Sequence, residues 1–189
     1  MHEVSRPIEE KTKGDIERKL EGMGDYVKMS YLQRALRSGF SYDTRKFILL
    51  KLSEIYESRK MFLEAARMIR SAAEINTTFK NKMQDYMKAV NLYIKGLDYV
   101  ETDRMFAQAL ALASNKEKLE LKGNFKDFHL EQARSLLNAD KRNQAKIVYE
   151  KILTLELDIE ERRELQKQLL DLYDKLGLVK DYYKLKNSM

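Results

Sequence analysis

The chain has 189 residues, of which 43% are hydrophobic and 35% are charged, and its formal net charge is +6. This apolar share can build a core, which argues against general disorder, and the length fits one or at most two domains. The absence of cysteine excludes disulfides, thiolate metal sites and cysteine nucleophiles, and it is compatible with a reducing compartment. One proline, Pro7, and seven glycines are too few turn residues for many short strands, so the composition favours helices.

Apolar residues recur at spacings of three and four almost throughout the chain, and no segment shows the sustained alternation of a strand. Ten helices connected by short links are therefore expected, and short links make neighbouring helices antiparallel. Their approximate ranges are 8–21, 24–38, 42–58, 61–75, 79–96, 99–114, 117–138, 141–156, 159–176 and 179–187. The Gly123-Asn124 pair could interrupt the seventh helix, and residues 1–7 are expected to be flexible.

No apolar run occurs in residues 1–30, and nowhere in the chain do about 18 apolar residues follow one another. We therefore expect no signal peptide and no membrane span, and we expect the protein to be cytoplasmic.

An internal repeat runs along these expected helices. Its best copy reads Leu49-x-x-Leu52-Ser53-x-x-Tyr56, followed by Ala65, Ile69 and Ala72. A second copy reads Tyr86-x-x-Ala89-Val90-x-x-Tyr93, followed by Thr102, Phe106 and Ala109. Equivalent positions in successive copies are Met29, Ala65, Thr102, Ala145 and Tyr182, at intervals of 36, 37, 43 and 37 residues.

This pattern resembles the tetratricopeptide repeat, a helix-turn-helix unit of about 34 residues. The resemblance covers roughly residues 13–187, but the intervals are longer, the proline that ends each family repeat is absent, and no tryptophan occurs. It implies an all-α, right-handed superhelix of about five antiparallel helix hairpins, a TPR-like solenoid that forms a single domain over residues 1–189. The helical-hairpin arrays of the soluble vesicle-fusion attachment proteins are a looser alternative.

Small residues in this pattern have a mechanical role, because two helices of a hairpin pack closely only where the crossing residue is small. Ala65 and Ala145 are expected to be the small crossing residues, and Tyr93→Ala is expected to cost about 3–5 kcal/mol if the Tyr93 ring is buried. One hairpin cannot bury its apolar stripe alone, so stacking of hairpins supplies the core.

Signals for catalysis are weak. The only histidines are His2 and His129, which excludes a metal site of several histidines, and His129 falls at a position expected to pack between helices. Glycine-rich phosphate-binding motifs are absent. We therefore expect a non-enzymatic protein without metal or cofactor, although a carboxylate-only reaction or a Mg²⁺ site stays open. The Asn76-Thr77-Thr78 triplet is interpreted as a helix end rather than a glycosylation site.

In tetratricopeptide domains the first helix of each repeat lines a groove that holds an extended peptide or a partner helix. The resemblance implies that the groove positions here are Lys51, Glu54, Met87, Lys88, Asn91, Lys95, Leu130, Arg134, Lys167 and Asp171. Family members that bind the C-terminal carboxylate of a peptide use Lys, Asn and Arg side chains, and Lys88, Asn91 and Arg134 match these in type.

The partner is therefore expected to be a protein or peptide. Leu178, Tyr182 and Tyr183 on the last expected helix could support self-association as a homodimer. The alternative is a helical-repeat protein that binds nucleic acid through dispersed Lys and Arg. The isoelectric point near 9.2 motivates this alternative, and the acids interleaved along the chain oppose it.

Overall fold

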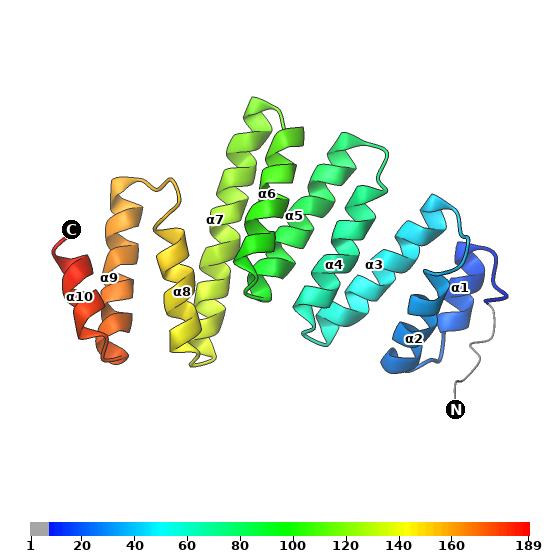
Figure 1. The fold of residues 1–189 in the computed structure, drawn as a ribbon, viewed down its shortest axis with the longest axis horizontal. Coiled ribbons are helices and arrows are strands. Elements are labelled where there is room, and N and C mark those ends of the chain that lie inside the picture. Colours follow the sequence, from blue (N-terminus) through cyan, green and yellow to red (C-terminus); the bar gives the residue numbers. More distant parts are fainter. Residues whose placement is uncertain (1–7) are drawn as a thin grey trace. The chain divides into compact units, whose positions relative to one another are not determined.

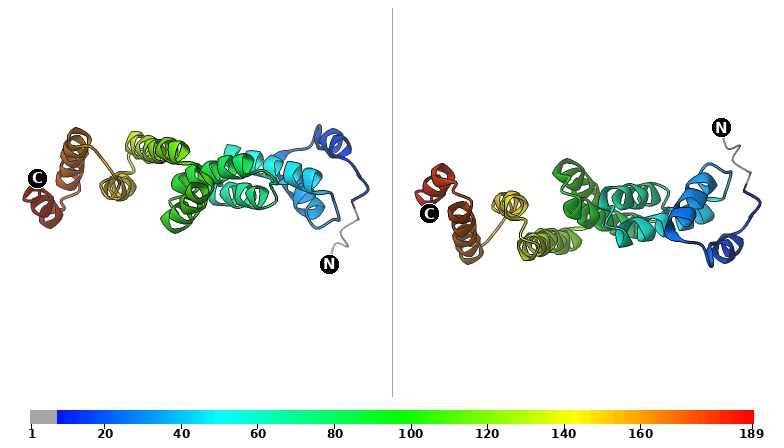
Figure 2. Two further views of the ribbon diagram at one scale, coloured as in Figure 1. Left: turned by 90° about the horizontal axis from the view of Figure 1, so that it is seen from above. Right: turned by 90° about the horizontal axis from the view of Figure 1, so that it is seen from below.

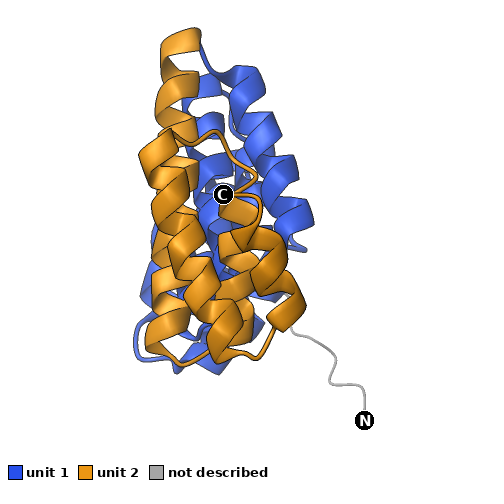
Figure 3. Ribbon diagram, turned by 90° about the vertical axis from the view of Figure 1, so that its left-hand side faces the viewer, with its two compact units in different colours: residues 1–114 blue, residues 115–189 orange. Residues whose placement is uncertain are grey.

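A computed structural model describes residues 8–189, and it divides the chain into two compact units, unit 1 (residues 1–114) and unit 2 (residues 115–189), shown in Figure 3. Every regular element in the described range is a helix, which confirms the predicted all-α class. The flexibility expected of residues 1–7 concerns a segment outside this range. Among the described residues, no helix has both the length and the apolar character that crossing a membrane requires.

Successive helices are antiparallel within each unit (Figure 1). Unit 1 contains α1 (Lys13–Leu20), α2 (Asp25–Ala35), α3 (Tyr42–Ser58), α4 (Phe62–Glu74), α5 (Phe79–Lys95) and α6 (Tyr99–Leu112). Unit 2 contains α7 (Asn115–Asn138), α8 (Arg142–Ile152), α9 (Ile159–Lys175) and α10 (Val179–Lys186). Viewed along the helices, consecutive helices of one unit alternate between two rows (Figure 2).

Two sequence-based expectations about helix ends are corrected. The first helix begins at Lys13 rather than near residue 8, because Thr12 and Asp15 form a capping box that fixes its start. The seventh helix, α7, runs unbroken through the Gly123-Asn124 pair, so this pair does not interrupt it. The sequence Asn76-Thr77-Thr78 does mark a helix boundary, since α4 ends at Glu74 and the Thr78 side chain accepts a hydrogen bond from the Asn81 amide of α5.

One turn geometry recurs between the two helices of four hairpins. Each turn places one residue in the left-handed region, with φ of 59° at Lys60, 61° at Leu97, 55° at Asp140 and 67° at Gly177. The next amide donates a hydrogen bond to the carbonyl oxygen five residues earlier. These bonds are Met61 N to Tyr56 O (2.8 Å), Asp98 N to Tyr93 O (3.0 Å), Lys141 N to Leu136 O (2.8 Å) and Leu178 N to Tyr173 O (2.8 Å). They satisfy carbonyls at the helix end in the manner of a Schellman motif, so the repeat read from the sequence is also a repeat of backbone conformation.

The predicted crossing residues Ala65 and Ala145 are both fully buried. At Ala65, α3 comes so close to α4 that the Ser53 hydroxyl of α3 donates a hydrogen bond to the Ala65 carbonyl oxygen at 3.1 Å. Thr102, at the equivalent position of α6, is also fully buried, and its hydroxyl donates to its own helix at Asp98 O. The two helices can therefore approach closely where this side chain is small, or where its polar group forms a hydrogen bond with its own helix segment.

In the α3–α4 and α9–α10 hairpins, a tyrosine near the end of the hairpin's first helix contacts the helix that precedes the hairpin. Tyr56 accepts a hydrogen bond from Gln33 of α2 (2.6 Å), and Tyr173 donates one to Glu150 of α8 (2.9 Å). Tyr93 is only 1% exposed, and its hydroxyl has no hydrogen-bond partner among the described residues. Burial raises the pKa of the Tyr93 phenol. This ring thus contributes to the core through packing rather than through a hydrogen bond.

Helices of the two units correspond at an offset of eighty residues. Phe79 at the start of α5 corresponds to Ile159 at the start of α9, and Lys95 at the end of α5 corresponds to Lys175 at the end of α9. Ala65 and Ala145 also differ by this offset, as do the turn residues Lys60 and Asp140. The correspondence allows surfaces of unit 1 and unit 2 to be compared residue by residue.

Candidate functional site: two equivalent hollows

Unit 1 contains a hollow of about 280 Å³, called hollow 1 here. The first helices of two consecutive hairpins, α3 and α5, form its sides, and Ile69 of the intervening α4 contributes to its floor. Its lining residues are Leu50, Ser53, Glu54, Glu57, Ile69, Lys88, Asn91 and Leu92. Three lining residues are buried, the apolar Ile69 and Leu92 and the polar Ser53, and the charged and amide groups of the lining are Glu54, Glu57, Lys88 and Asn91.

Ion pairs occupy most of the charges around hollow 1. Lys51 pairs with Glu54 at 2.9 Å, both on α3, and Lys95 of α5 pairs with Glu57 of α3 at 3.0 Å. Lys88 lies 3.9 Å from Asp85 on its own helix, and its side chain is 66% exposed. The half-buried Asn91 makes no side-chain hydrogen bond to any part of the chain described. Lys88 and Asn91 are therefore the groups of hollow 1 that can best bind a ligand.

Unit 2 contains a corresponding hollow of about 320 Å³, called hollow 2 here. Its lining residues are Leu137, Asp140, Arg142, Tyr149, Gln168, Asp171, Leu172 and Lys175. Five of these correspond to lining residues of hollow 1 at the offset of eighty residues, namely Leu137 to Glu57, Tyr149 to Ile69, Gln168 to Lys88, Asp171 to Asn91 and Leu172 to Leu92. Each unit thus has a hollow at the same place in its repeat.

Charges around hollow 2 also pair with one another. Arg142 pairs with Asp140 at 3.0 Å, Lys175 pairs with Asp171 at 2.6 Å, and Gln168 donates to Glu164 at 3.1 Å. The Tyr149 ring is only 3% exposed, and burial raises the pKa of its phenol.

Five of the predicted groove residues come together around hollow 1. Glu54, Lys88 and Asn91 line it, and Lys51 and Lys95 form the ion pairs at its sides. Met87 of α5 does not share this open surface, because it is 7% exposed and packs inside unit 1. Nine of the seventeen α5 residues are buried, so the exposed face of this helix is narrower than an amphipathic pattern predicts.

Four predicted groove residues belong to unit 2. Asp171 lines hollow 2, and the Arg134 guanidinium lies near Tyr149, where its charge lowers the pKa of that phenol against the effect of burial. Leu130 is half-buried and Lys167 is exposed, and neither lines hollow 2. Of the three residues that match a carboxylate clamp in type, Lys88 and Asn91 share hollow 1, whereas Arg134 is part of unit 2.

Of the eight lining residues of hollow 2, sequence reasoning predicted Asp171; it missed Leu137, Asp140, Arg142, Tyr149, Gln168, Leu172 and Lys175. The offset of eighty residues was the signal that could have found Leu137, Tyr149, Gln168 and Leu172, because it aligns each of them with a lining residue of hollow 1. Tyr149 and Ile69 lie on the second helices of their hairpins, whereas the family-based expectation considered first helices alone.

The remaining candidates lie outside the hollows. Leu178, just before α10, and Tyr182 on α10 are half-buried, and the Tyr183 ring is 56% exposed and lies edge-on to Tyr182, with 5.5 Å between the ring centroids. His129 is fully buried, its Nδ1 lies 2.8 Å from the Phe125 carbonyl oxygen, and its ring contacts the Phe125 ring edge-on. This is the packing role expected of His129. Residues 8–189 contain no cluster of three or more His, Asp or Glu side chains that could hold a metal ion.

No protein-family model and no curated protein matches this chain. Among solved structures, the chain is similar to the crystal structure of BtubC (BKLC) from P. vanneervenii, with 14% sequence identity and a TM-score of 0.38. That match covers 93% of this chain and 70% of the other. A likeness of this size establishes neither a common fold nor a common function.

Proposed function

We propose that this protein is a non-enzymatic, tetratricopeptide-like interaction module, an adaptor or assembly factor that binds a peptide or partner helix. The observation that carries the proposal is the recurrence of a hollow between the first helices of consecutive hairpins in both units. A hollow that an array repeats at equivalent positions is a property of the repeat and provides a series of side-chain pockets for a partner chain.

Hollow 1 has the chemistry that an extended peptide requires. The Asn91 amide can both donate a hydrogen bond to a peptide carbonyl oxygen and accept one from a peptide amide, so it can bind the backbone of any sequence. Lys88 provides a positive charge beside it for an acidic side chain or a terminal carboxylate. The apolar floor from Ile69 and Leu92 can take an uncharged side chain.

The ion pairs around hollow 1 favour a protein partner over a nucleic acid. Lys51 and Lys95 each pair with a glutamate, so these cations are already neutralised where they could contact a phosphate backbone. A fluorescent single-stranded oligonucleotide should therefore show no salt-dependent binding to the protein. Tight binding at low salt that weakens steeply with added salt would instead support the alternative of a nucleic-acid-binding repeat protein.

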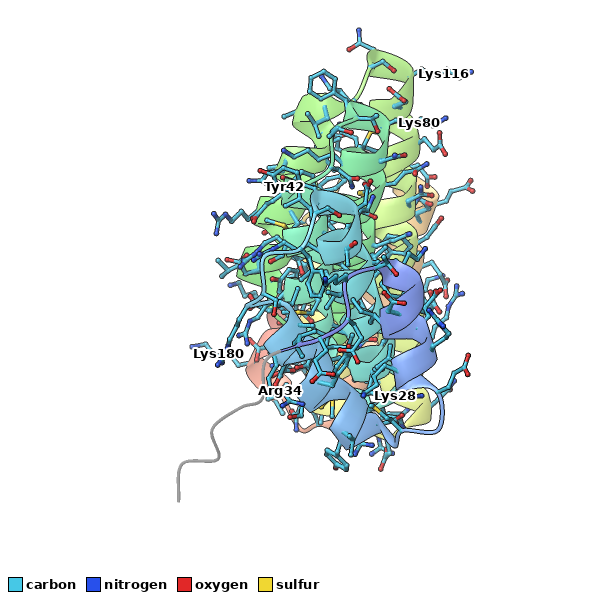
Figure 4. The ribbon with its side chains drawn as sticks, turned by 90° about the vertical axis from the view of Figure 1, so that its right-hand side faces the viewer. Lys28, Arg34, Tyr42, Lys80, Lys116 and Lys180 are labelled. Carbon is cyan, nitrogen blue, oxygen red and sulfur yellow. The ribbon has the colours of Figure 1, made fainter. Side chains whose placement is uncertain are left out.

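A displayed library of random twelve-residue peptides would test the proposal directly. Peptides enriched on the full-length protein should bind the double variant Lys88→Ala/Asn91→Ala about tenfold or more weakly, because two polar contacts are lost. Lys80→Ala is the matched control. Lys80 lies on the same helix but points into solvent at the N-terminal end of α5 (Figure 4), and it does not line hollow 1.

Two results would contradict the proposal. One is a selection that enriches no peptide above background. The other is a set of enriched peptides whose affinity falls equally in the double variant and in the Lys80→Ala control, since the contacts would then lie outside hollow 1. Circular dichroism of all three proteins checks that the substitutions leave the helices intact.

Two further parts of the proposal concern assembly and location. Self-association through Leu178, Tyr182 and Tyr183 stays a prediction, and light scattering should find a dimer that the Tyr183→Glu substitution dissociates. An unchanged dimer mass in that variant would contradict it. We also place the protein in the cytoplasm, because a chain without cysteine has no need of an oxidising compartment.

A further inference from the structure

One position of the repeat carries a basic residue in α3, α7 and α9. It lies fourteen residues before the left-handed turn residue of the hairpin, and its occupants are Lys46, Lys126 and Arg163. The helix α5 differs, since it has the buried Met83 at this position. A basic residue at this position is therefore a feature of the repeat that three hairpins share.

In α3 and α7 this basic residue pairs with an acid of the hairpin that follows. The Lys46 ammonium lies 3.7 Å from the carboxylate of Asp85, a residue of α5 that is only 5% exposed. The Lys126 ammonium donates a hydrogen bond to the carboxylate of Glu161 on α9. In each unit the cation thus joins its own first helix to the next first helix along the chain.

A second charge of α3 lies three residues before the turn residue. Glu57 occupies this position and pairs with Lys95 of α5 at 3.0 Å. The side of α3 that faces α5 therefore has a cation near one end and an acid near the other, and each has a partner of opposite sign on α5. The same two positions of α9 are Arg163 and Asp174, which have the same signs in the same order.

These charges of α9 belong to a stripe of four residues, called the outer stripe here. Its members are Arg163, Lys167, Leu170 and Asp174. Spacings of four, three and four residues place them on one side of the helix. Leu170 is half-buried, and the three charged side chains are exposed and form no ion pair with any residue from 8 to 189. The outer stripe thus repeats the end charges of α3 without the helix that neutralises them there.

We propose that the outer stripe binds a partner helix that runs parallel to α9 and carries an acidic residue opposite Arg163 and a basic residue opposite Asp174. The occupant is a helix because the equivalent basic residues of α3 and α7 both pair with a following first helix. Its charges follow from complementarity, and Lys167, which stands where α3 has Leu50, favours a further acidic group. That the helix comes from a partner protein rests on the proposed function.

A stapled helical peptide with the sequence of α5 is a suitable probe, because it carries Asp85 and Lys95 on the side that α3 binds. With the staple on the opposite side and a fluorescein at the N-terminus, its anisotropy should rise and saturate as full-length protein is added. A charge-reversed peptide, with Asp85→Lys and Lys95→Glu, should bind about tenfold or more weakly, because both attractive pairs become repulsive.

Reversing the charges of the outer stripe tests the assignment. The variant Arg163→Glu/Asp174→Lys should bind the charge-reversed peptide more tightly than the original one, so the preference should invert. Lys80→Glu/Asp43→Lys makes the same changes at exposed positions of unit 1 and should keep the native preference. Circular dichroism checks that both variants retain their helices. Absence of saturable probe binding to the native protein, or a preference that does not invert, would overturn the inference.

The double variant Lys88→Ala/Asn91→Ala distinguishes this inference from the proposed function. It disrupts hollow 1 and should leave the affinity for the stapled helix unchanged. If library peptides do not depend on Lys88 and Asn91 but the preference for the helix still inverts, the proposed use of hollow 1 is wrong and the outer stripe stands. If the native protein is a dimer that Arg163→Glu/Asp174→Lys dissociates, the occupant is a second copy, and the assignment to a partner helix is wrong.

Discussion

Unit 1 and unit 2 are built from equivalent hairpins but bury them to different extents. Nine of the seventeen residues of α5 are buried in unit 1, against four of the seventeen in the equivalent α9 of unit 2. The same holds for the helices that follow, since α6 buries three residues and α10 none. The turn with a left-handed residue and the small crossing residue are nevertheless the same in α3–α4 and α7–α8.

This difference shows that hairpin formation and core packing depend on different residues. The turn and the crossing residue define how each hairpin folds back on itself, and both units retain them. The number of apolar positions on each helix defines how much of the hairpin its neighbours cover, and this number is lower in unit 2. Because stability in such arrays is a sum of local contributions, variants at equivalent positions should separate hairpin formation from core packing.

The largest expected effect is that of Tyr93→Ala in unit 1. The ring is only 1% exposed, so its removal leaves a cavity and should reduce the free energy of unfolding by about 3–5 kcal/mol. Tyr173→Ala in unit 2 should cost less, because Tyr173 is 7% exposed and its site can admit water. Urea unfolding followed by circular dichroism measures both changes, and native-state hydrogen exchange assigns each to its unit.

Tyr93→Phe and Tyr173→Phe make this comparison sharper. The Tyr93 hydroxyl has no partner among the residues described, so its loss should leave stability unchanged or increase it. The Tyr173 hydroxyl donates to Glu150 at 2.9 Å, so its loss should cost about 0.5–1.5 kcal/mol. Equal effects of the two substitutions would show that the hydrogen bond on Tyr173 contributes nothing.

The next largest effect concerns the crossing residues, Ala65 in unit 1 and Ala145 in unit 2. Ala65→Leu should cost about 1–3 kcal/mol, because the larger side chain would push α3 away from α4 and break the Ser53–Ala65 hydrogen bond. Ala145→Leu should cost a similar amount, since both positions are fully buried. Ala139→Leu is a suitable control for Ala145→Leu, because Ala139 is exposed. A cost confined to Ala65 would mean that the hairpin of unit 2 does not depend on a small crossing residue.

Periodicity and the repeat predicted much of the fold and only part of the site. The apolar spacing located the ten helices of residues 8–189, and the alignment of Ala65 with Ala145 placed both crossing residues correctly. Both features are local, because they depend on which side chains share one face of a helix. The early start expected for the first helix was wrong. The apolar Ile8 suggested a start near residue 8, but the capping box at Thr12 begins the helix at Lys13.

The site was harder to predict because it depends on how charges pair across helices. The sequence contains Lys at both 95 and 175, and only the structure shows that one pairs with Glu57 and the other with Asp171. Met87 follows the groove pattern of α5, yet it is buried because neighbouring helices cover more of α5 than its own periodicity indicates. Contacts between elements, rather than patterns within one element, thus define the two hollows.

The smallest expected effect concerns the turns, where four different residues adopt the same left-handed conformation. Gly177 adopts φ of 67° without strain, and a Cβ added there would meet no atom within 4 Å. Gly177→Ala should therefore cost only the backbone strain of a left-handed residue with a side chain, about 1 kcal/mol, measured as a shift of the urea midpoint. Lys60→Gly in unit 1 is the reverse change at φ of 59°, and it should stabilise by less than about 1 kcal/mol, because relief of strain is opposed by the greater freedom of glycine in the unfolded chain. If Gly177→Ala cost as much as Ala145→Leu, the turn rather than the crossing residue would limit the hairpins of unit 2.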